Sequence, residues 1–126
     1  MLTNATIFAT IPTRDLKKAK AFYVNKLGLR QVADPSTHGY MLAAADGSKL
    51  FIYEGDTRPD NDLVVAAFFV KGIEQVVQSL RNKGVKFEPM ISGMPTDENG
   101  VIGNDREKAA CFRDPDGNLL SLSELL

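Results

Sequence analysis

Residues 111–124 read CFRDPDGNLLSLSE, and this stretch decides the fold. A short apolar start leads into the turn residues Asp-Pro-Asp-Gly-Asn, and leucines then alternate with serines. Asp116-Gly117 is a strong signal for a β-hairpin, because glycine accepts the positive φ that such turns require. The stretch therefore predicts a hairpin whose second strand has one apolar face and one face of hydroxyls.

The same pattern occurs earlier in the chain, where Ala45-Asp46-Gly47-Ser48 precedes KLFIYE. Aligning the two Asp-Gly pairs matches Leu50 with Leu120, Phe51 with Ser121, Tyr53 with Ser123 and Glu54 with Glu124. Residues 9–16 align in the same way with residues 66–73, and both segments run from an expected strand into an expected helix. We infer an internal repeat, in which each copy contains a strand, a helix and further strands that end in a hairpin.

Periodicity gives the elements of the first copy. Asp15 is a plausible N-cap for a helix that ends at Gly28, with an apolar stripe of Leu16, Ala19, Tyr23 and Leu27. Strands are expected at residues 6–13, 29–33, 40–45 and 49–54, with a polar loop at 34–39 and a charged linker at 55–62.

The second copy differs from the first mainly by a long insertion. Residues 63–70 are almost continuously apolar and predict a well-buried strand. A helix with the stripe Ile73, Val76, Val77 and Leu80 follows Gly72 and ends near Gly84, and another strand is expected at residues 85–90. Residues 91–107 show no clear periodicity, so a functional lid, an ordered arm and a mobile loop all remain open.

Length and charge exclude several classes of protein. A chain of 126 residues fits one domain, and 15 basic against 16 acidic residues give no reason to expect binding to nucleic acid or to an anionic membrane. No apolar run approaches the length of a membrane span. Cys111 is the only cysteine and makes no internal disulfide, so we expect a cytoplasmic protein.

Two segments, IPTRDLKKAKAFYVNKLGL (11–29) and FRDPDGNLLSLSE (112–124), carry a family resemblance. The chain resembles the glyoxalase / bleomycin-resistance / extradiol-dioxygenase superfamily, which has the vicinal oxygen chelate (VOC) fold. The resemblance implies an α+β fold of two βαβββ modules, whose curved mixed sheets enclose a cavity that dimerisation commonly completes. We expect one VOC domain over residues 1–126, with module one at about 5–54, the linker at 55–62 and module two at about 63–126.

Metal-dependent members of this superfamily carry His, Glu or Gln ligands on the first and last strand of each module. The equivalent positions here are Phe8, Phe51, Val65 and Ser121. Three of these side chains have no donor atom, and a serine alone is a poor ligand. A register shift of one residue brings no better set, and the single histidine, His38, lies in a predicted loop. We therefore expect no metal, no cofactor and no catalytic residue.

Strand alternation predicts which side chains face the cavity. One set of side chains should pack on the helices: Ile7, Ile11, Ile52, Phe68, Leu120 and Leu122. Ala67 and Leu119 should lie on the opposite, concave side. The expected ligand contacts on the concave side are Phe8, Thr10, Phe51, Tyr53, Val65, Phe69, Ser121 and Ser123. Aromatic walls with a few hydroxyls are typical of a small-molecule pocket, although the aromatics could instead simply fill the space.

Other candidate groups have more ordinary interpretations. Cys111 is expected to be a buried structural residue rather than a nucleophile. Arg113 either clamps an anionic ligand or forms an ion pair at the end of a strand. The acidic residues Asp97, Glu98, Asp105 and Glu107 are expected to be solvating charges.

Three functions remain open, of which we favour the first. It is a metal-free binder of a small aromatic or amphipathic molecule, similar to the antibiotic-sequestering proteins of the superfamily and working as a homodimer. The alternative is a glyoxalase- or dioxygenase-like enzyme, a lyase or oxidoreductase, with an atypical or absent metal site and acid–base chemistry at Tyr53, Glu54 or Glu124. The third is a dimeric regulatory module without a catalytic role.

Overall fold

A computed structural model of the chain describes residues 1–36, 38–57 and 62–126. The chain divides into two compact units, residues 1–57 and residues 58–126. Parts of the predicted linker (58–61) and of the predicted polar loop (37) lie outside the described residues. None of the described helices is both long enough and apolar enough to cross a membrane.

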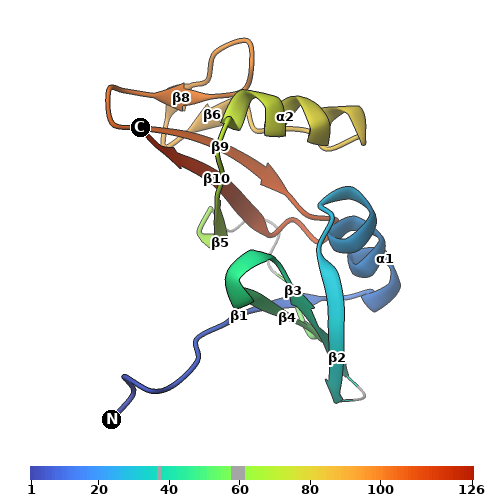
Figure 1. Ribbon diagram of the computed structural model, residues 1–126. Helices are drawn as coiled ribbons and strands as arrows, with labels where there is room; N and C mark the ends of the chain where they lie inside the picture. Colours follow the sequence, from blue (N-terminus) through green and yellow to red (C-terminus); the bar gives the residue numbers. More distant parts are fainter. Residues whose placement is uncertain (37, 58–61) are drawn as a thin grey trace. The chain divides into compact units, whose positions relative to one another are not determined.

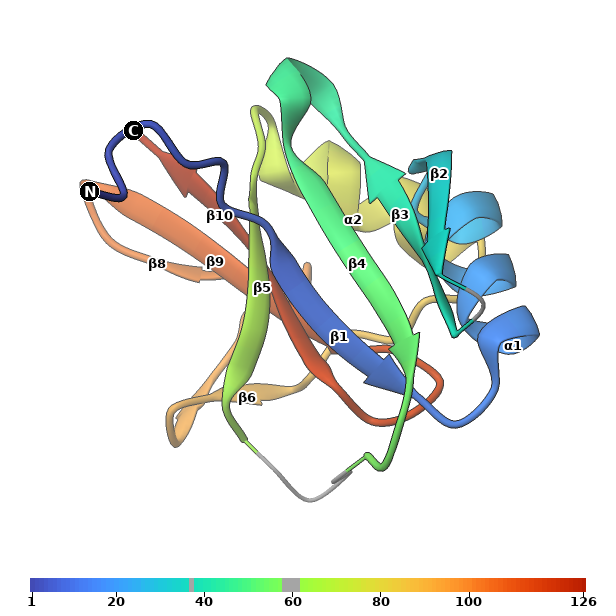
Figure 2. The same ribbon diagram turned by 90° about the horizontal axis from the view of Figure 1, so that it is seen from below.

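The first unit is a four-stranded sheet with helical segments on one face (Figure 2). The strand order is β1 (Ala9–Thr13), β4 (Lys49–Glu54), β3 (Gly39–Ala43), β2 (Arg30–Ser36). β1 runs parallel to β4, whereas the other pairs are antiparallel. The helical part consists of α1 (Leu16–Lys20) and the π-helix η1 (Ala21–Lys26), and the short 3-10 turn η2 (Ala45–Gly47) joins β3 to β4.

The second unit repeats this arrangement, with α2 (Ile73–Asn82) against its sheet (Figure 1). The strand order is β5 (Val64–Phe69), β10 (Leu119–Leu125), β9 (Glu107–Arg113), β8 (Ile102–Gly103). Again the first strand lies at an edge and runs parallel to the last. A separate hairpin is formed by β6 (Met90–Ile91) and β7 (Met94–Pro95). The two equivalent sheets confirm the predicted α+β fold of two βαβββ modules.

The first helix begins where the sequence predicts but continues with a wider turn. The Asp15 carboxylate accepts hydrogen bonds from the backbone N–H groups of Lys17 and Lys18, both at 3.1 Å, which confirms the N-cap. Further on, the N–H of Leu27 bonds to the carbonyl of Phe22, a π-helical i→i+5 step. In this wider turn both Phe22 and Tyr23 are buried. The predicted apolar stripe included Tyr23 but not Phe22.

The core of each unit lies between its sheet and its helix. Fully buried side chains include Ile11, Leu42 and Ile52 in the first unit and Ile73, Phe112 and Leu120 in the second. The prediction that Ile7 packs on a helix is wrong. β1 begins only at Ala9, and Ile7 precedes it with 91% of its surface exposed.

Two predicted features of the second unit are also corrected. The strand at 63–70 is not well buried, because β5 is an edge strand with a single neighbour, and Phe69 is 76% exposed. Of the strand predicted at 85–90, one isolated bridge to its own sheet is described, between Phe87 and Phe112, and Met90 belongs to the separate β6–β7 hairpin. Pro89 follows and has no N–H to continue a ladder, so the chain leaves the sheet there.

The long insertion at 91–107 is largely ordered by short hairpins and turns. Its first residues complete the β6–β7 hairpin, and β8 pairs with β9. Between them, the Asp97 carboxylate accepts hydrogen bonds from the backbone N–H groups of Asn99 (2.8 Å) and Val101 (3.0 Å). Of the alternatives left open for this insertion, the described structure favours the ordered arm.

Candidate functional site

The open face of the first sheet, which is the face away from α1 and η1, carries a pair of aromatic rings. Phe51 and Tyr53 alternate on β4 with the buried Ile52, and both are partly exposed. Their rings are stacked, with centroids 6.3 Å apart and planes inclined by 15°. Thr10 lies beside Phe51 in the parallel register of β1 and β4. Phe8 precedes β1 and is 42% exposed.

The remaining predicted site residues lie in the second unit. Ser121 is buried and Ser123 is partly exposed, and they pair across β10–β5 with Ala67 and Phe69. Val65 falls at a register irregularity, because Leu119 pairs with Val64 and Leu120 with Ala66. The predicted contacts therefore form one group in each unit, and their participation in a common site remains a prediction.

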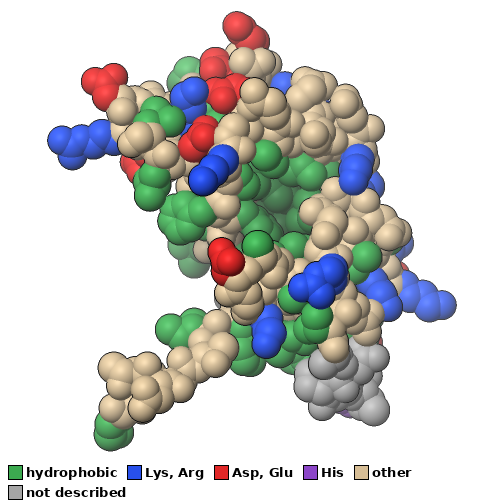
Figure 3. Space-filling model, in the orientation of Figure 1, with side chains coloured by type: hydrophobic (Ala, Val, Ile, Leu, Met, Phe, Trp, Pro, Cys, Tyr) green, Lys and Arg blue, Asp and Glu red, His purple; other side chains and the backbone are tan. Residues whose placement is uncertain are grey.

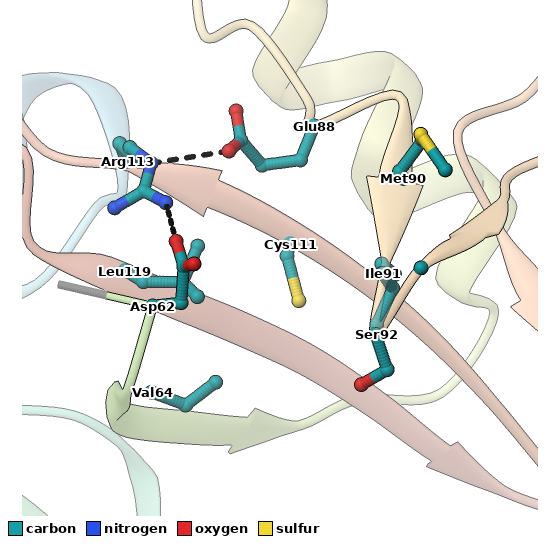
Figure 4. A pocket seen from close by; sticks show the side chains of 10 residues that line it. Asp62, Val64, Glu88, Met90, Ile91, Ser92, Cys111, Arg113 and Leu119 are labelled. Atoms are coloured by element: carbon teal, nitrogen blue, oxygen red, sulfur yellow. Dashed lines mark hydrogen bonds and ion pairs between the residues drawn. The ribbon is translucent and has the colours of Figure 1, made fainter. Parts of the chain in front are cut away.

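The second unit contains a cavity of about 430 Å³ on the open side of its sheet (Figure 4). The floor comes from β5, β9 and β10, and the β6–β7 hairpin forms a wall. The lining residues are Asp62, Val64, Glu88, Met90, Ile91, Ser92, Gly93, Cys111, Arg113 and Leu119. At the strand irregularity it is Val64, the partner of Leu119, that reaches this cavity.

An ion-pair cluster closes one side of this cavity (Figure 4). Arg113 Nε lies 3.1 Å from Glu88 Oε1, and Arg113 Nη2 lies 3.0 Å from Asp62 Oδ1. The third nitrogen, Nη1, donates to the carbonyl of Gly117 at 2.9 Å. Burial opposes the charge of Arg113, but the hydrogen bonds with Glu88 and Asp62 outweigh it and raise the pKa of the guanidinium. Of the two interpretations of Arg113, the geometry favours the ion pair at a strand end.

Cys111 lies in the cavity floor and is 5% exposed, as the sequence predicts for a structural cysteine. Burial raises the pKa of its thiol, and the nearby Glu88 carboxylate adds to this effect, while Arg113 opposes it. The thiol therefore stays protonated at neutral pH, and it is a weak nucleophile in that form.

Glu124, one of the acid–base candidates, has a structural role. Its carboxylate accepts hydrogen bonds from the backbone N–H groups of Gly72 (2.6 Å) and Ile73 (3.1 Å) at the start of α2. These bonds lower its pKa, because they stabilise the ionised form. A carboxylate held in this way is a poor general base, so the geometry gives no support to catalysis by Glu124.

The residues predicted to occupy the family's ligand positions do not fit a metal ion. Phe8, Phe51 and Val65 offer no nitrogen or oxygen donor, and Ser121 lies between apolar neighbours on β10. Within residues 1–36, 38–57 and 62–126, no three or more His, Cys, Asp or Glu side chains are grouped so that they could hold a metal ion.

Sequence reasoning missed the part of the cavity wall that comes from residues 88–93. One local signal was present, because Ser92-Gly93 is a turn dipeptide flanked by apolar residues. Both residues have positive φ, 51° and 80°, as a two-residue hairpin turn requires. Asp62 and Glu88 have no comparable signal, since only the folded chain brings them to Arg113.

Comparison with known proteins identifies the family. Residues 6–122 match the Glyoxalase/Bleomycin resistance protein/Dioxygenase superfamily. The chain belongs to this superfamily. The uncharacterized protein YwkD of Bacillus subtilis (strain 168), which is 33% identical over 102 residues, is a relative of this VOC protein, and the match covers 71% of the present chain and 80% of YwkD.

Solved structures support the VOC fold. TnmS3, an antibiotic binding protein from Streptomyces sp. CB03234, is similar with a TM-score of 0.73 and 22% identity, over 98% of this chain and 99% of TnmS3. The fosfomycin resistance protein FosX of Listeria monocytogenes gives a TM-score of 0.73 at 19% identity, over 98% and 92% of the two chains. A glyoxalase family protein from Enterococcus faecalis gives 0.70 at 25% identity, over 98% and 100%.

Proposed function

We propose that this VOC protein is a metal-free binder of a small aromatic or amphipathic molecule. It acts as a cytoplasmic homodimer, and burial and stacking supply the binding free energy. No bond is made or broken in the ligand.

The observation that carries this proposal is the side chain of Phe51. At a position where metal-dependent relatives have a ligand, this chain has an aromatic ring that stacks on Tyr53 and is partly exposed. Such a pair offers a flat apolar surface to an aromatic ligand, and the hydroxyls of Thr10 and Tyr53 can orient it. The antibiotic-binding relative TnmS3 supports the same class of function.

A binding screen with two variants tests the proposal. We expect saturable binding of at least one compound from a library of aromatic and antibiotic-like molecules. Phe51→Ala should weaken that binding by about tenfold, because a stacking contact of about 1 kcal/mol and its buried area are lost. Tyr53→Phe keeps the ring and serves as the matched control, with a smaller loss from the hydroxyl alone. An unchanged affinity in Phe51→Ala would contradict this use of the aromatic face.

The metal-free part of the proposal has its own measurement. Native mass spectrometry of protein purified without added metal or chelator reports the oligomeric state, bound metals and co-purified small molecules together. We expect a dimer without a stoichiometric metal ion. One first-row metal ion per chain, or metal-dependent turnover of a hemithioacetal or catechol-type substrate, would favour the enzyme instead.

A further inference from the structure

The cavity of the second unit combines an apolar floor with a rim of unbalanced charge. Val64, Cys111 and Leu119 form the floor, and Met90 and Ile91 stand on the hairpin wall (Figure 4). These side chains offer a ligand only apolar and weakly polar contacts. The apolar body of a ligand therefore fits between the sheet and the β6–β7 hairpin.

The charges of the lining residues that the structure describes sum to a negative value. One guanidinium, that of Arg113, faces two carboxylates, those of Glu88 and Asp62, which leaves a formal charge of −1. Glu88 contributes more than Asp62 to the negative potential in the cavity. The side chain of Glu88 is 33% exposed, whereas that of Asp62 is 90% exposed and its charge is screened by water. A cleft whose lining has one net sign of charge concentrates ligands of the opposite sign.

An anionic ligand would meet electrostatic repulsion here. Each nitrogen of the Arg113 guanidinium already donates to an oxygen of the protein: Glu88, Asp62 or the carbonyl of Gly117. A ligand carboxylate or phosphate that approached this guanidinium would also come close to the Glu88 and Asp62 carboxylates, which costs electrostatic free energy. The cavity thus disfavours the anions that a lone arginine would attract.

We propose that this cavity selects cationic amphipathic molecules, with the apolar body on the floor and the cationic head at Glu88 and Asp62. The inference rests on the proposed function as a small-molecule binder, and it adds a second binding site, in the cavity of the second unit and separate from the aromatic face of Phe51 and Tyr53, together with the charge of its ligand. Met90 and Ser92 should let the cavity accept ligands whose apolar parts differ in shape. A methionine side chain can adopt different rotamers, and the β6–β7 hairpin that carries both residues pairs with no other described strand.

Three naphthalene probes that differ only in their head group test this proposal. They are 2-naphthylmethylammonium, 2-naphthylmethanol and 2-naphthylacetate, titrated into ¹⁵N-labelled full-length protein at low ionic strength. We expect the ammonium probe to bind at least about threefold more tightly than the alcohol, as one partly exposed charge allows, and the acetate to bind most weakly. The shifted amides should include Cys111 and Leu119, and the preference should fade in about 0.5 M salt.

Charge variants sharpen the test. Glu88→Gln brings the formal charge of the lining to zero and should abolish the preference for the ammonium probe. Adding Asp62→Asn brings the charge to +1 and should invert the preference toward the acetate. Glu98→Gln, an exposed glutamate outside the cavity lining, is the matched control and should behave as the wild type. Chemical-shift dispersion verifies that each variant is folded.

The outcomes separate this inference from the proposed function. Equal affinities for the three probes, or shifts confined to Phe51 and Tyr53, would overturn the cationic cavity while leaving a small-molecule binder. An acetate preference in the wild type would also overturn it. If no amide shifts with any probe, and the aromatic library also fails to bind, the binder function itself is refuted.

Discussion

At the scale of single residues, one buried carboxylate holds the β9–β10 turn. Asp114 is 5% exposed, and its Oδ1 accepts hydrogen bonds from the backbone N–H groups of Asp116 and Asn118, both at 2.9 Å. Its Oδ2 accepts a third from Asn118 Nδ2 at 2.9 Å. Asp114→Ala leaves these donors without an acceptor, so we expect a loss of about 2–4 kcal/mol in the free energy of unfolding, measured with urea.

Two further variants test that explanation of Asp114. Asp114→Asn keeps one carbonyl oxygen as an acceptor and should lose less than the alanine variant. Asp105→Ala removes an exposed aspartate and should stay within about 0.5 kcal/mol of the wild type. If Asp114→Ala is no less stable than Asp105→Ala, the side chain does not anchor the turn.

At the scale of elements, the start of α2 depends on a side chain from the far end of the chain. Gly72 precedes the helix with a φ of 70° and has no side chain to cap it, so the Glu124 carboxylate of β10 accepts the first N–H groups. Because the pKa of Glu124 is lowered in the folded state, its stabilisation is present at neutral pH. It is lost as the pH falls below the ordinary glutamate pKa of about 4.3 and through the lowered value.

Thermal unfolding of the variant Glu124→Gln tests whether the charged carboxylate stabilises the start of α2. At pH 7 its Tm should lie below that of the wild type, because a neutral amide interacts less favourably with the helix N-terminus. The difference should shrink as the pH falls below the ordinary glutamate pKa of about 4.3 and then through the lowered pKa, because the wild-type carboxylate becomes protonated. Glu98→Gln should show no such change, and a Tm difference that is independent of pH would argue against the charged cap.

The elements were predictable where local patterns decide them. Asp15 as N-cap, Gly28 and Gly84 at helix ends and the hairpin at Asp116-Gly117 all follow from local backbone chemistry. Burial was not predictable in this way. The apolar run at residues 63–70 is typical of a core strand, yet its place at the sheet edge leaves side chains exposed, and an edge position depends on the whole topology.

At the scale of the whole molecule, the repeat was predictable because aligning the two Asp-Gly turns also aligns the strands that follow them. The parallel pairing of the first and last strand of each copy agrees with that alignment. The cavity was not predictable, since Asp62, Glu88 and Arg113 are far apart in the sequence and meet only through the fold. The family and the aromatic residues of β4 were therefore predictable from the sequence, whereas the charged cluster beside the cavity was not.

The exposed apolar surface supports the proposed dimer. Hydrophobic side chains reach the molecular surface (Figure 3), and on the edge strand β5 and the residue before it they include Leu63, Val64 and Phe69. Apolar side chains on an edge strand favour association with another chain. We therefore expect a dimer at micromolar concentration in light-scattering measurements, with Phe69 in or near the interface.

Substitution of Phe69 tests this interface. Phe69→Glu should shift the protein to the monomer without unfolding it, because the side chain is 76% exposed and its loss removes little core packing. Phe69→Leu keeps an apolar contact and should remain dimeric. A wild-type monomer would refute the dimer itself. A dimer that persists in a folded Phe69→Glu variant would place the interface elsewhere, since a charge buried opposite an apolar partner surface is strongly unfavourable.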